Sequence, residues 1–123
     1  MKIIYNKIIP FGKGFYALNL FGVLFAKGPC DKVTLNHEKI HTAQMKEWLY
    51  IPFYIVYLIE WFIRIIQYKG YTRGYYNISF EREAYANQYD LDYLNNRKHF
   101  ASFQYLKNKN KLDPFGDNYE KYS

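Results

Sequence analysis

The segment His37–His41 reads His-Glu-Lys-Ile-His, with two histidines four positions apart. In an α-helix, residues four apart lie on one face, so both imidazoles reach the same point only if this segment is helical. The sequence favours a helix here, because Asp31 or Thr34 can cap one that begins near Val33. The chain is therefore expected to fold so that this helix turns its histidine face toward another part of the molecule.

This spacing is typical of zinc sites. Imidazole nitrogen is a common zinc ligand, and His37 and His41 would bind one ion from successive helical turns. Glu38 follows the first ligand, where its carboxylate can accept a proton from a metal-bound water and later return it to a leaving amine. The sequence thus predicts two metal ligands and a catalytic base. The alternative is that two of the three histidines in the chain share a helix face without any metal.

Two imidazoles are too few for a stable zinc site, so a third ligand must come from elsewhere. The run Glu-Arg-Glu-Ala-Tyr supplies two candidates, Glu81 and Glu83. On a helix these carboxylates point about 200° apart, so only one of them can be the ligand. Ala84, close to one turn after Glu81, is small enough to let the two helices approach closely. Either glutamate can also be read as a solvated residue at a helix start.

His37–His41 and the downstream Glu-x-x-Ala together resemble the gluzincin metallopeptidases. The resemblance implies zinc as cofactor, a peptide or protein substrate, and Glu81 as the third ligand. Gluzincins usually carry Asp or Asn where this chain has Tyr85, and Asn87 takes that place if Glu83 is the ligand. The chain is also similar, over most of its length, to small bacterial His-Glu-x-x-His proteins with the tract Phe-Glu-Arg-Glu-Ala-Tyr-Ala-Asn.

The expected activity is hydrolysis of peptide bonds by water that zinc and Glu38 activate. Gluzincin peptidases bind an extended substrate along an edge strand, a role that the apolar run from Phe15 to Lys27 could take. The small size of the chain supports a second hypothesis, because little remains for a substrate cleft. In this hypothesis the protein binds zinc without catalysis and associates with a membrane surface or a regulatory partner.

Other polar residues are candidates for supporting roles. Gln44 follows His41 by about one turn and could hydrogen-bond to a metal ligand. Glu60 is unusual within an apolar helix, and it either pairs with Arg64 four residues later or reaches a buried partner such as a ligand histidine. The resemblance adds Tyr85 and Asn87. Candidates for stabilising an oxyanion are Tyr68, Tyr71, Tyr75, Tyr76 and His99.

The remaining pattern predicts an α+β fold of one domain over residues 1–123. Lys2 to Ile9 reads as a strand, Gly12 to Gly14 as a turn, and Phe15 to Lys27 as a second strand run. These would form a short N-terminal β-hairpin or small antiparallel sheet packed on about three helices. Tyr68 to Ser79 reads as a loop, and Phe80 to Asn96 as a helix capped by Ser79. A basic, frayed tail is expected from about residue 107.

Trp48 to Ile66 is the most apolar stretch of the chain. Pro52 can end the preceding helix or lie in the first turn of a new one. A membrane span needs about 20 apolar residues with few charges, and here Glu60 and Arg64 interrupt the run. The sequence therefore favours a buried core helix over a helix lying on a membrane or spanning it.

The formal charge of +6 favours an anionic partner such as a membrane surface, although a moderate positive charge also aids solubility. No nucleic acid is expected, because the basic residues Arg97, Lys98, Lys107, Lys109 and Lys111 match no recognised binding motif. One cysteine, Cys30, excludes an internal disulfide. The expected location is cytoplasmic with possible membrane association.

Overall fold

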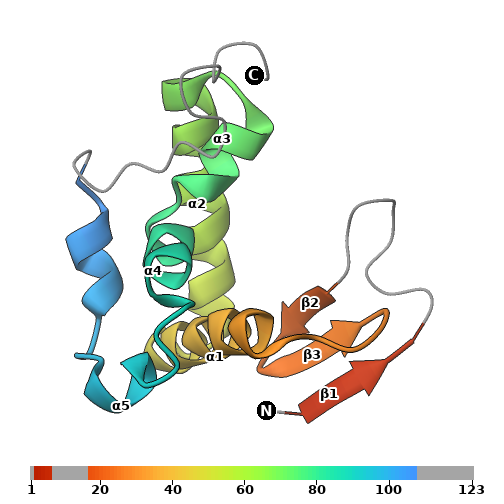
Figure 1. Ribbon diagram of the computed structural model, residues 1–123. Helices are drawn as coiled ribbons and strands as arrows, with labels where there is room; N and C mark the ends of the chain where they lie inside the picture. Colours follow the sequence, from red (N-terminus) through yellow and green to blue (C-terminus); the bar gives the residue numbers. More distant parts are fainter. Residues whose placement is uncertain (1, 7–16, 108–123) are drawn as a thin grey trace.

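The computed structural model describes residues 2–6 and 17–107, and these form an α+β fold (Figure 1). The predicted turn at Gly12–Gly14, the strand residues after Asn6 and most of the predicted tail lie outside the described residues. The described strands come first in the chain, as β1 (Lys2–Tyr5), β2 (Ala17–Leu20) and β3 (Val23–Ala26). The helices follow in the order α1 (Lys32–Glu47), α2 (Ile51–Tyr68), α3 (Tyr71–Tyr76), α4 (Ser79–Asn87), α5 (Tyr93–Asn96) and the 3-10 helix η1 (Ala101–Tyr105).

The three described strands form one sheet in the order β1-β3-β2. β2 and β3 form a hairpin within the run Phe15 to Lys27, which the sequence predicts as one strand of a hairpin with Lys2 to Ile9. The turn of the observed hairpin, at Phe21 and Gly22, uses positive φ at both residues. β1 pairs with β3 in parallel, so the sheet is mixed rather than antiparallel. Parallel neighbours cannot be joined by a tight turn, and β2 lies between β1 and β3 in the sequence. Leu24 and Ala26 on β3 are fully buried, which fixes the face of the sheet that meets the helices.

α1 begins where the sequence predicts. The side chain of Asp31 accepts a hydrogen bond of 2.7 Å from the backbone N–H of Thr34, so Asp31 is the N-cap. Asn19 of β2 ties the sheet to this helix, because its amide donates to the backbone oxygen of Glu38 and to the hydroxyl of Thr42, each at 3.0 Å. The hairpin is therefore held directly beside the predicted catalytic base.

α2 lies crosswise to α1 (Figure 1). Pro52 lies in the first turn of α2, which is one of the two positions that the sequence allowed for it. The corner between these helices contains two consecutive residues with positive φ, Leu49 and Tyr50. The predicted buried core helix is wrong for most of α2, because only Phe53, Glu60 and Arg64 are buried along it. Within the described residues α2 is also the one helix long and apolar enough to cross a membrane.

The predicted loop from Tyr68 to Ser79 contains a helix, α3. Its glycines suggested a loop, but Gly74 serves close packing instead. A Cβ at Gly74 would lie 2.8 Å from the backbone nitrogen of Ile65, so only glycine lets α3 pack this closely on α2. Glycine at this position therefore marks a helix contact, which residue type alone does not distinguish from a turn.

The start of α4 is capped from another helix. Ser79 is the first residue of α4 rather than its predicted N-cap, and Ile78 stands in the cap position without a side-chain hydrogen bond. Glu60 of α2 accepts from the Ser79 backbone N–H at 2.7 Å and from the Ser79 hydroxyl at 2.6 Å. It also pairs with Arg64, 3.3 Å away, as the four-residue spacing predicted. A negative charge at a helix N-terminus interacts favourably with the helix dipole, so Glu60 stabilises α4. Glu60 thus contacts Ser79 and Arg64, neither of which is a candidate metal ligand.

α4 ends at Asn87, and the predicted single helix to Asn96 is interrupted there. The amide nitrogen of Asn36 on α1 donates to the backbone oxygens of Asn87, Gln88 and Asp90. Backbone oxygens at a helix end need such partners, and here one side chain from α1 supplies them. The hydrogen bonds fix the C-terminal end of α4 against α1, which brings Glu81 to the histidine face.

Candidate metal centre

His37, His41 and Glu81 converge on one point between α1 and α4, and all three side chains are buried. The Nε2 atom of His41 lies 3.1 Å from Nε2 of His37 and 3.1 Å from Oε1 of Glu81. Nε2 of His37 lies 3.3 Å from the same oxygen. A tetrahedral zinc ion with bonds of about 2.0–2.1 Å holds its ligand atoms about 3.3–3.4 Å apart. The three atoms therefore have nearly the spacing that a zinc ion requires.

Hydrogen bonds on the far side of each imidazole orient these rings. Nδ1 of His41 lies 2.8 Å from Oε1 of Gln44, and Nδ1 of His37 lies 2.9 Å from Oε1 of Gln88. The amide nitrogen of Gln44 donates to the oxygens of Phe80 and Glu83, so its amide oxygen must be the acceptor for His41. His41 thus carries a proton on Nδ1 and turns Nε2 inward, the arrangement usual for a metal ligand.

Two imidazole nitrogens and a carboxylate oxygen facing one another repel unless a cation lies among them. Burial by itself would lower the pKa of His41, but the carboxylate of Glu81 outweighs this and raises that pKa to about 9. Burial would likewise raise the pKa of Glu81, and the charge on His41 instead holds it well below its usual range. Without a metal, the cation is a proton on His41; binding of zinc would displace that proton.

Tyrosines complete the surroundings of Glu81. The hydroxyl of Tyr57 on α2 donates to Oε2 of Glu81 at 2.6 Å, which leaves Oε1 to face the histidines. Burial, followed by the charge of Glu81, raises the pKa of Tyr57 and of Tyr75, so both phenols remain hydrogen-bond donors. The ring of Tyr85 lies against the ring of His37, with centroids 4.5 Å apart. Tyr85 therefore contacts the candidate ligand His37 through its ring, at the position where the gluzincin resemblance implies Asp or Asn.

Glu38 is half-buried on α1, directly after His37. Burial raises its pKa, while the charges of His41 and His37 and a hydrogen bond with Asn19 act in the opposite direction. A carboxylate with a raised pKa holds a proton more readily near neutral pH, as a general base must. The position and the environment of Glu38 suit the predicted role.

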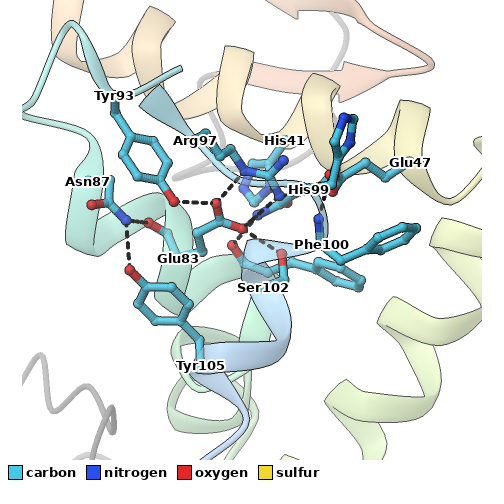
Figure 2. Close-up of polar contacts among 12 residues, drawn as sticks. His41, Glu47, Glu83, Asn87, Tyr93, Arg97, His99, Phe100, Ser102 and Tyr105 are labelled. Carbon is cyan, nitrogen blue, oxygen red and sulfur yellow. Dashed lines mark hydrogen bonds and ion pairs between the residues drawn. The ribbon is translucent and has the colours of Figure 1, made fainter. Parts of the chain in front are cut away.

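Glu83, the alternative ligand, is not part of the cluster of His37, His41 and Glu81. Its carboxylate lies in a neighbouring hydrogen-bond network, which Gln44 links to His41 (Figure 2). Its fully buried carboxylate accepts hydrogen bonds from Gln44, Tyr93, Arg97 and Ser102. Burial opposes the ionisation of Glu83, but the hydrogen bonds from Arg97 and Ser102 outweigh burial and lower its pKa. The structure thus brings Glu81 and not Glu83 to the histidines, as the opposite helix faces of the two residues require.

The other sequence candidates divide clearly. Gln44 contacts His41 as predicted, and Tyr85 contacts His37 through its ring. Asn87 lies outside the site, because its amide donates to the backbone oxygen of Glu83 and to the hydroxyl of Tyr105. Among the candidates for stabilising an oxyanion, Tyr75 lies near Glu81. The hydroxyl of Tyr68 accepts a hydrogen bond from Arg82. Tyr71 and His99 are largely exposed.

Sequence reasoning missed two residues, Gln88 and Tyr57. Gln88 lies seven residues after Glu81, which places both on one side of a helix two turns apart, so this spacing was a usable signal. Tyr57 comes from α2, and nothing in a chain with 15 tyrosines distinguishes it. Its role depends on the crossing of two helices, which spacing along the sequence does not reveal.

Replacing Gln88 by alanine is expected to weaken zinc binding about 10–100-fold, because the ring of His37 loses the partner that fixes its orientation. Competition with a zinc-chelating dye would measure the affinity. Gln104→Ala on η1 is the matched control and should leave the affinity unchanged. Equal affinities for the Gln88 variant and the unchanged protein would contradict this role of Gln88.

Comparisons with known proteins found no relative of this chain. No protein-family profile, no curated protein and no solved structure matches the chain. The interpretation of the site therefore depends on its own geometry.

Proposed function

We propose that the protein is a zinc-dependent metallopeptidase, in which His37, His41 and Glu81 hold the metal and Glu38 is the general base. The observation that carries this proposal is the convergence of two imidazole nitrogens and one carboxylate oxygen at mutual distances of 3.1–3.3 Å. Two histidines and one glutamate are a donor set of catalytic zinc sites, which keep a fourth position for water or substrate.

Zinc in such a site acts as a Lewis acid that makes water nucleophilic near neutral pH. The residues of the chain would divide the other tasks. Gln44 and Gln88 orient the two imidazoles, and Tyr57 holds the second oxygen of Glu81. Glu38 accepts the proton of the attacking water and returns it to the leaving amine.

The neighbouring sheet supports a peptide as the substrate. β2 is an edge strand of the described sheet, and Asn19 within it contacts the backbone of Glu38. An extended peptide adds to such an edge through main-chain hydrogen bonds, which would bring its carbonyl groups alongside the base.

Incubation of the zinc-loaded protein with a mixed peptide library, read by mass spectrometry, tests the proposal. New cleavage products are expected, and a chelator should abolish them until zinc is added back. Cleavage that survives complete removal of the metal would contradict a zinc mechanism. Absence of any cleavage by the fully zinc-loaded protein would favour the second hypothesis, a zinc-binding protein without catalysis.

A further inference from the structure

One face of α2 carries only large apolar side chains and points away from the other described elements. At 100° per residue this face covers an arc of about 140°. Glu60 and Arg64, the charged residues of α2, are buried on the opposite side. Seven apolar side chains of the face are more than half exposed, namely Ile51, Ile55, Leu58, Ile59, Phe62, Ile63 and Ile66.

The apolar surface continues past the start of α2. Leu49 is 77% exposed at the corner between α1 and α2, where its φ of 58° holds it in the left-handed region. That conformation is unfavourable for a residue other than glycine, and here it keeps a leucine in contact with solvent. Beside it an apolar hollow of about 420 Å³ is lined by Glu47, Trp48, Leu49, Pro52, Phe100 and Phe103.

The exposed charges favour an anionic partner for this surface. Every described glutamate is buried or half-buried, and the exposed acids of the described residues are Asp31, Asp90 and Asp92. Lys46, in the last turn of α1 before the corner, and Lys69, the C-cap of α2, are both exposed. The other exposed lysines among the described residues are Lys2, Lys32, Lys39, Lys98 and Lys107. Apolar side chains flanked by lysines suit a bilayer with anionic headgroups.

A helix that crosses the bilayer fits these observations less well. The side of α2 opposite the apolar face is covered by α3 and by the start of α4, with the Glu60–Arg64 ion pair between them. Those covering segments carry buried polar groups such as Arg73, which lipid on all sides of the helix would not accommodate. A helix that lies along the surface immerses only its apolar face.

A second copy of the chain is also a weaker fit. Two helices that pair through their faces bury a narrow seam of about two residues in seven, whereas this arc is wider. Part of the apolar face would therefore stay in water in such a dimer. We propose that the exposed face of α2, with Leu49, docks on the surface of an anionic lipid bilayer with the helix axis parallel to the membrane.

Flotation of the full, zinc-loaded chain with vesicles of phosphatidylcholine and phosphatidylglycerol in equal amounts tests the proposal. Binding at low salt is expected. The Ile59→Gln variant should partition about tenfold or more weakly into the vesicles, because the side chain that enters the bilayer becomes polar. Leu91→Gln is the matched control, since Leu91 and Ile59 are 56% and 57% exposed, and it should bind as the unchanged chain does. Circular dichroism would confirm that both variants are folded.

Two further experiments distinguish a helix on the membrane surface from a spanning helix and from a dimer. Reversal of charge at Lys46 and Lys69 should weaken binding to these vesicles several-fold and leave binding to pure phosphatidylcholine unchanged. A membrane-impermeant amine reagent should label both lysines on bound protein, because a helix on the surface keeps both ends on one side. Labelling of only one lysine would show a spanning helix and overturn the proposal. So would absence of vesicle binding, or a dimer in solution that Ile59→Gln dissociates.

Discussion

The Glu38→Gln variant is expected to bind zinc as tightly as the unchanged protein and to hydrolyse peptides about 10²–10⁴-fold more slowly. Glutamine has the shape of glutamate but has no carboxylate to accept the proton of the attacking water. The metal ligands His37, His41 and Glu81 are untouched, so the metal should remain. Initial rates on a peptide found in the library screen, with zinc content measured on the same samples, would check both halves of the prediction.

Glu47→Gln is a suitable control, because it makes the same chemical change at the end of the same helix. Glu47 pairs with Arg97, accepts from the backbone N–H of Phe100 and lies 3.5 Å from Nδ1 of His99. It is not part of the cluster of His37, His41 and Glu81. Its variant should keep the hydrolysis rate of the unchanged protein. Full activity of Glu38→Gln toward the same peptide would rule out the proposed role of Glu38, even with zinc in place.

Glu83→Ala is expected to lower the free energy of unfolding by about 3 kcal/mol or more. The variant removes a fully buried carboxylate to which Arg97, Tyr93 and Ser102 donate (Figure 2). Arg97 keeps Glu47 as a partner, but the hydroxyl groups and one side of the guanidinium would be left buried without an acceptor. Urea denaturation followed by circular dichroism would measure the loss.

The same variant also separates the two glutamates. Glu83→Ala should retain zinc in its folded fraction, whereas Glu81→Ala should lose it. Lys98→Ala, at an exposed position, is the stability control and should unfold at nearly the urea concentration of the unchanged chain. An unaltered unfolding midpoint for Glu83→Ala, together with loss of zinc, would exchange the roles assigned to Glu81 and Glu83.

Signals between residues close in the sequence predicted much of the structure. The capping of α1 by Asp31, the position of Pro52 in the first turn of α2 and the pairing of Glu60 with Arg64 all depend on residues a few positions apart. The chemistry of zinc predicted that His37 and His41 need a third ligand and left Glu81 and Glu83 as candidates. The resemblance to gluzincins favoured Glu81, the glutamate that lies beside the two histidines. No pattern in the sequence shows by itself that the two helices carrying these residues lie side by side.

Contacts between distant residues account for the errors. The end of α4 depends on Asn36, which lies 51 residues before the first backbone oxygen that it contacts. The cap of α4 comes from Glu60 rather than from Ser79 beside it, and α3 packs through Gly74, which read as part of a loop. The apolar length of α2 suggested a core, yet along α2 only Phe53, Glu60 and Arg64 are buried in the described part of the structure.

Zinc content, measured by elemental mass spectrometry on the purified protein beside its His41→Ala variant, tests the central claim most directly. About one zinc ion per chain is expected for the unchanged protein, and essentially none for the variant, because two remaining ligands do not hold the ion. Folded protein that never met a chelator and still contains no metal, or a His41→Ala variant that keeps its zinc, would contradict the assignment of His37, His41 and Glu81 as a metal centre.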